Sequence, residues 1–223
     1  EITGQEGAVI ERFDPRKRFL ENLAQLNPAN KVLVTCRIKD LDEINTQVSL
    51  NGAITLQPLD DEQMAEYLRD QPALLSAIQT DDGLREMART PLLLSLLTYA
   101  YAGLGAKAVA LGDLSKSPGE LRWEIFSTYV RRRYEREEMR TKKQPAYSLE
   151  QIYSTLGQMF FEYPFNIKMR RMVRNATEFA PTGKEEFVEL VERLHFIVQV
   201  RPQVYRFIHL LLRDHFILAY CKS

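Results

Sequence analysis

The spacing of apolar residues changes at Pro58, and this change limits the possible folds of the chain more than any other feature. Two short β-rich runs, Lys31–Arg37 and Ala53–Gln57, come before it, whereas apolar residues after it recur at the helical period of about 3.6. The first run is Val-Leu-Val between polar residues, which is typical of a strand covered on both faces in a parallel sheet. Residues 1–58 are therefore predicted to be the C-terminal end of an α/β domain.

This part also contains a predicted helix, which begins at the capping pair Asp14-Pro15 and leads into the first strand. Two strands alone do not make a stable sheet, so we expect further strands to come from elsewhere. The opening Glu1-Ile2-Thr3 has no initiating methionine, which favours a piece of a longer protein.

Helical patterns follow Pro58. Asp60 and Gln63 have the spacing of a capping box, which marks the start of the first helix. A helical domain is predicted at residues 59–114, and a connecting helix, basic at its far end, at residues 115–145.

Residues 146–223 combine helices with a β-hairpin. The predicted elements are a helix from Ser148, a short helix within 164–174, a helix from Thr182, a hairpin over Phe196–Ile208 and a helix over His209–Tyr220. The first and third of these begin with capping-box spacing. Helices followed by a hairpin are the parts of a winged-helix domain.

Composition argues against several classes of protein. Thirty basic side chains balance thirty acidic ones, so no overall charge attracts nucleic acid or an anionic membrane. Cys36 and Cys221 lie far apart without a pairing pattern, which favours a reducing, cytoplasmic location. The uncharged run Thr90–Ala106 is shorter than the ~20 residues of a membrane span, so a buried core helix is predicted there.

Several familiar motifs are missing from the sequence. It has no Gly-rich Lys-Ser/Thr phosphate loop, no Gly-x-Ser-x-Gly elbow, no His-Glu-x-x-His and no Cys-x-x-Cys. Gly103-Leu-Gly105 matches a relaxed dinucleotide fingerprint, but helical patterns flank it where that fingerprint needs strands, so we interpret it as a helix stop. His209 and His215 would be turned about 120° apart on a helix, and no metal site is predicted.

Seven basic residues gather between positions 131 and 143, with Glu135, Glu137 and Glu138 among them. Beside a predicted winged helix, such a cluster suggests nucleic-acid binding. The interleaved acids favour a solvated, salt-bridged surface instead, and we prefer that interpretation. A winged-helix module that binds nucleic acid or protein, with no nucleotide role, remains the alternative function.

Arg37, Pro91 and His209 are candidates for a binding site. Arg37 would end a strand of a parallel sheet, where ligands bind and where a guanidinium can meet a phosphate. Each residue also has an ordinary explanation, because Arg37 can be an ion-pair partner and the other two can simply begin helices.

Four segments give these candidates a common context. They are Val34-Thr-Cys-Arg37, Arg89-Thr-Pro-Leu-Leu-Leu-Ser-Leu-Leu97, Leu121-Arg-Trp-Glu-Ile-Phe-Ser-Thr-Tyr-Val130 and Phe207-Ile-His-Leu-Leu-Leu-Arg-Asp-His-Phe216. In their order and spacing they resemble the back half of a NACHT-type NTPase of the STAND class. The resemblance implies a mostly α chain: a remnant of a parallel α/β P-loop NTPase sheet, then a helical bundle and a winged-helix domain.

The resemblance also implies roles for the three candidates. Arg37 matches the catalytic sensor arginine at the terminal phosphate. Pro91 matches the proline that packs beside the adenine, and His209 matches the histidine that reaches the diphosphate in the closed, ADP-bound state. The intact parent would bind ATP or ADP with Mg and hydrolyse ATP. This chain lacks the phosphate loop, so it is expected to hold no bound nucleotide and to be inactive alone.

The implied protein is a cytoplasmic signalling switch, with bacterial defence as one role of the family. Its implied partners are the nucleotide, the N-terminal half of the NACHT module, an effector domain and C-terminal sensor repeats, with a homo-oligomer formed on activation. No residue of this chain selects the activating ligand or the effector.

Overall fold

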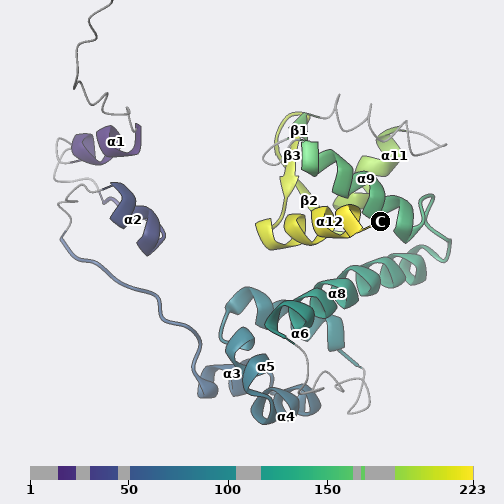
Figure 1. Ribbon diagram of the computed structural model, residues 1–223, viewed down its shortest axis with the longest axis horizontal. Helices are drawn as coiled ribbons and strands as arrows, with labels where there is room; N and C mark the ends of the chain where they lie inside the picture. The colour runs from purple at the N-terminus through teal and green to yellow at the C-terminus, as the bar shows by residue number, and fades with distance from the viewer. Residues whose placement is uncertain are drawn as a thin grey trace, which may run out of the picture. The chain divides into compact units, whose positions relative to one another are not determined.

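A computed structural model describes residues 15–23, 31–44, 51–103, 117–162, 167–168 and 184–222 (Figure 1). The chain divides into two units, Glu1–Leu56 and Gln57–Ser223. Most of the described residues are helical, so the mostly α class predicted from the sequence is confirmed.

The described part of the first unit contains two short helices, α1 (Pro15–Leu23) and α2 (Ile38–Ile44). The first begins at the predicted proline, but neither predicted strand is formed. Residues 31–37 and 51–57 have no helix or strand, and Leu33 and Ile54 are 88% and 92% exposed. A strand buried in a parallel sheet needs hydrogen-bonded neighbours, and the described part of this unit supplies none.

Up to Thr141, the described residues of the second unit form five helices whose first turns follow the sequence signals. They are α3 (Asp61–Tyr67), α4 (Pro72–Thr80), α5 (Asp82–Ala88), α6 (Pro91–Tyr101) and α8 (Pro118–Thr141). The predicted capping box forms, since the Asp60 carboxylate accepts the Gln63 N–H at 2.8 Å and the Gln63 side chain accepts the Asp60 N–H at 3.1 Å. A second capping box, from Ser117 and Glu120, begins α8.

Helix α6 is the buried core helix predicted for the uncharged run. Leu94, Leu97 and Ala100 are almost fully buried, and the helix packs against α5 and α8. Among the described helices, none is long and apolar enough to cross a membrane.

The remaining elements form a helical layer against a small sheet. In chain order they are α9 (Leu149–Glu162), β1 (Ile167–Lys168), α11 (Lys184–Arg193), β2 (Ile197–Arg201), β3 (Val204–Phe207) and α12 (Leu210–Lys222). The sheet is antiparallel, in the order β1-β3-β2. Ile197 faces Phe207 across the hairpin and Gln199 faces Tyr205, so the predicted hairpin is confirmed.

Two predictions for this region differ from the structure or lie beyond it. Residues 167–168, expected to be helical, form β1 instead, because they pair with Tyr205 and Val204 of β3, far along the chain. The rest of the predicted short helix and the expected cap at Thr182 lie outside the described residues.

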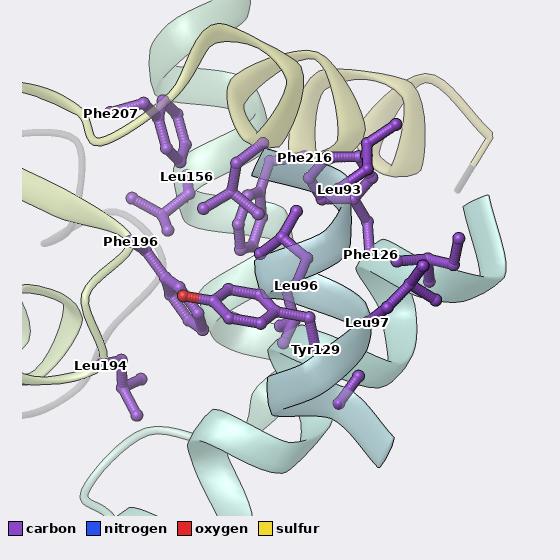
Figure 2. Close-up of a cluster of buried hydrophobic side chains, with 14 of the residues drawn as sticks. Leu93, Leu96, Leu97, Phe126, Tyr129, Leu156, Leu194, Phe196, Phe207 and Phe216 are labelled. Carbon is purple, nitrogen blue, oxygen red and sulfur yellow. The ribbon is translucent and has the colours of Figure 1, made fainter. Parts of the chain in front are cut away.

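One continuous apolar core runs through the second unit. Figure 2 shows leucines of α6, Phe126 and Tyr129 of α8, and Phe196, Phe207 and Phe216 of the sheet and its helices in this core. Helices α9 and α12 approach each other closely at Gly157, where an added Cβ would lie 2.6 Å from the Phe216 carbonyl oxygen. The core thus joins the helical bundle to the hairpin-bearing part.

Candidate functional site

Pro91 is the first residue of α6 and is exposed. The chain that enters the second unit is attached just beside it, because the Leu59 N–H donates to the Arg89 carbonyl at 2.8 Å. Arg89 also pairs with Asp61 at 3.4 Å and with Glu86 at 3.7 Å. Pro91 therefore stands next to the point where residues 1–56 connect to the helical bundle.

A polar cavity of about 520 Å³ opens beside this connection. Its lining consists of Gln57, Pro58, Asp82, Arg85, Glu86 and Arg89. Arg85 already donates to the Gln79 carbonyl at 3.2 Å and lies 3.8 Å from Asp82. Because carboxylates form ion pairs with both arginines, the cavity has no strong preference for an anion.

His209 lies between β3 and α12 and is half-buried. Its carbonyl accepts the Arg213 N–H at 3.2 Å, and its ring Nδ1 accepts the Leu211 N–H at 3.1 Å, so the residue caps α12. In a neutral imidazole whose Nδ1 is an acceptor, the proton is on Nε2. The cap therefore fixes a ring whose Nε2 is a hydrogen-bond donor.

Arg37 is exposed and immediately precedes α2. Its carbonyl accepts the Leu41 N–H at 3.0 Å, so it begins a helix and does not end a strand. It belongs to the first unit, whereas Pro91, in α6, and His209, which caps α12, belong to the second; both of these helices pack against α8. Convergence of the three residues on one ligand remains a prediction.

His215 is a core residue, as the simpler interpretation of this histidine predicts. Its ring lies 4.4 Å from Trp123 and 5.6 Å from Phe126, and its Nε2 is 2.9 Å from the Tyr153 hydroxyl. Burial, with a smaller effect of the nearby Lys222 charge, lowers its pKa from 6.5 to about 4. The described residues contain no group of side chains suited to a metal ion.

The basic end of α8 is largely occupied by contacts within the chain. Arg132 donates to the carbonyls of Ala100 and Ala102 at 3.3 and 3.5 Å, which ties α8 to the end of α6. Arg131 and Arg132 also pair with Glu135 at 3.9 and 3.6 Å. These contacts agree with the salt-bridged interpretation of the cluster.

Glu137 is a buried carboxylate that joins α8 to α11. Its two oxygens accept from Arg140 at 2.9 Å each, and one also accepts from Arg193 of α11 at 3.0 Å. The hydrogen bonds from Arg140, against an opposing effect of burial, hold the pKa of the carboxyl below its usual 4.5. Sequence spacing indicates the Arg140 contact, but no local signal identifies Arg193.

We expect Glu137→Gln to destabilise the chain by about 1–3 kcal/mol at neutral pH, because two arginines lose a charged acceptor on a buried side chain. The measurement is urea unfolding at pH 7. Glu138→Gln, which changes an exposed neighbour, is the control and should be nearly neutral. Equal stability of the two variants would contradict a structural role for the carboxylate.

A second cavity, of about 600 Å³, lies between the first turns of α8 and the end of α12. Trp123 forms part of its lining, with Leu218 and Lys222 across from it. The Lys222 ammonium lies 4.2 Å from the centre of the Trp123 ring, an arrangement that places a cation on an aromatic face. The Trp123 indole thus lies between this cavity and the buried His215 ring.

Comparisons with protein-family models, curated proteins and solved structures give no match to this chain.

Proposed function

We propose that the chain is the back half of a NACHT-type, nucleotide-dependent signalling switch. In this proposal Arg37, Pro91 and His209 contact one nucleotide from three parts of the chain, and its identity sets how those parts are arranged. The observation that carries the proposal is the His209 ring, whose Nδ1 accepts the Leu211 N–H, so that the proton of a neutral ring is on Nε2.

The topology of the second unit supports this proposal. A helix, a short strand, a further helix and a hairpin, with sheet order β1-β3-β2, form the arrangement that we assign to a winged helix. His209 lies directly after the hairpin, where the resemblance requires the phosphate-contacting histidine. Pro91 is the first residue of α6, and the resemblance assigns to it the packing contact with the adenine.

The residues of the chain fit only part of such a nucleotide site. A proline, an imidazole donor and a guanidinium suit the base and phosphates, but the sequence has no phosphate loop with its lysine and Mg-binding hydroxyl. In the proposed protein that loop, and the strands that would complete the sheet, come from an N-terminal half. The chain alone is expected to hydrolyse no ATP.

The alternative function, nucleic-acid binding by the winged helix, is disfavoured by the charge of α11. This helix precedes the hairpin, in the place of a recognition helix, and it exposes Glu185, Glu186 and Glu189. Three carboxylates on the surface that would meet DNA oppose binding to phosphates. The affinity for ADP distinguishes the switch from a protein-binding role with no nucleotide.

The test uses a protein in which this chain follows a segment that carries the phosphate loop. His209→Ala and Arg37→Ala are each expected to weaken ADP binding by roughly 10- to 100-fold, since each removes a hydrogen bond to a charged phosphate. Isothermal titration calorimetry measures the affinity. His195→Asn is the matched control, because His195 is exposed and has a φ of 57° that asparagine tolerates. Unchanged ADP affinity in both alanine variants would exclude the proposal.

A further inference from the structure

Two arginines of α8, Arg133 and Arg136, stack on the same tyrosine of α6, Tyr99. Each guanidinium carbon lies 4.0 Å from the centre of the Tyr99 ring. Because both distances end at one point, the two guanidinium carbons are at most about 8 Å apart. The two guanidinium groups therefore lie close together at the Tyr99 ring.

The aromatic contacts hold these side chains in place before any ligand arrives. The Arg133 Nε also donates to the Tyr129 hydroxyl at 3.1 Å, and Tyr129 packs edge-on against Tyr99 with ring centres 5.3 Å apart. Tyr129 is itself buried. A guanidinium that is already ordered loses less conformational entropy when it binds an anion.

The two arginines differ from their neighbours in what they contact. Arg131, Arg132 and Arg140 each pair with a glutamate. Within the described part of the chain, no carboxylate pairs with Arg133 or Arg136, whose recorded partners are tyrosines. Arg133 is half-buried and Arg136 exposed, so two positive charges remain accessible and are not neutralised by a paired acid.

We propose that Tyr99, Arg133 and Arg136 form a binding site for a phosphate dianion, either free or carried by a small molecule. One bidentate arginine satisfies a carboxylate, whereas two arginines match the charge and the three oxygens of a phosphate. At the helical rise of about 1.5 Å per residue, Tyr99 and Pro91 are about 12 Å apart along α6. The site therefore lies about two turns of α6 away from Pro91, and none of its residues is among the proposed nucleotide contacts.

The test is calorimetric titration of the 223-residue chain with inorganic phosphate and with phenyl phosphate, a phosphomonoester. Binding at a single site is expected. The double variant Arg133→Gln, Arg136→Gln should lose at least tenfold in affinity, and Tyr99→Leu, which keeps both charges, should lose severalfold because the arginines are no longer held. Arg131→Gln is the matched control on the same helix and should bind as the unchanged chain does. Circular dichroism establishes that each variant is folded.

Two outcomes would overturn this inference. Equal weakening by Arg131→Gln would mean that phosphate binds to the general positive charge of α8. A lack of phosphate binding at millimolar concentration, with binding of a single-stranded oligonucleotide that falls steeply with salt, would assign the arginines to nucleic acid instead. Tighter binding of phenyl phosphate would indicate a ligand-borne phosphate, and tighter binding of inorganic phosphate the free anion; both results support the site.

Discussion

Gly157→Ala is expected to destabilise the second unit by about 2–3 kcal/mol, although alanine is the better helix former. The added Cβ would lie 2.5 Å from the Tyr220 Cβ and 2.6 Å from the Phe216 carbonyl oxygen. The second of these atoms is backbone, so α9 and α12 must move apart and loosen the core between them.

The free energy of unfolding in urea measures this effect. The matched control is Gly119→Ala, at a helical glycine of α8 whose added Cβ would meet its nearest atom only at 3.9 Å. That variant should be neutral or slightly stabilised. Unchanged stability of Gly157→Ala would show that the two helices do not cross as closely as described.

Acidification should cost the chain about 3 kcal/mol of stability through His215 alone. The pKa of this residue is 6.5 when unfolded and about 4 when buried, so the unfolded state binds the proton more readily at intermediate pH. The stabilising contribution of neutral His215 is complete above pH 6.5 and is lost as the pH falls toward about 4. Each unit of difference between the unfolded and folded pKa corresponds to about 1.4 kcal/mol of this loss.

The measurement is the free energy of unfolding between pH 7 and pH 4, compared with that of His215→Phe. The phenyl ring keeps an aromatic side chain beside Trp123 and Phe126 but cannot titrate. Its stability should vary less with pH over this range. Glu137 adds its own loss only below its usual pKa of 4.5, because its folded pKa is lowered. Parallel pH profiles of the two proteins would contradict a buried, neutral His215.

Local sequence signals predicted the helix starts and the hairpin well. The pairs Asp60–Gln63 and Ser148–Gln151 both form reciprocal hydrogen bonds, since a capping box depends on residues only three positions apart. The hairpin is likewise local, with its two strands joined at the predicted turn.

Features that depend on distant residues could not be predicted in this way. The run Lys31–Arg37 has a strand-like composition, but a strand forms only when neighbours pair with it, and the structure leaves it without them. Strand β1 depends on β3, and the bond between Glu137 and Arg193 spans 56 positions. Among the candidate site residues, the helix-start positions of Pro91 and His209 were predictable, whereas the predicted position of Arg37 at a strand end was wrong, because Arg37 begins α2.

The two native cysteines allow a direct test of the proposal that nucleotide identity sets the arrangement of the two units. Cys36 lies beside Arg37 in the first unit, Cys221 lies at the end of α12, and both are free and exposed. Spin labels are attached to them in a protein in which this chain follows a segment that carries the phosphate loop and any further cysteine is replaced. Electron paramagnetic resonance then reports the distance between the units. We expect a narrow distance distribution with ADP that broadens or shifts without it, and no ADP effect in His209→Ala. A distribution that is the same with and without ADP would contradict it.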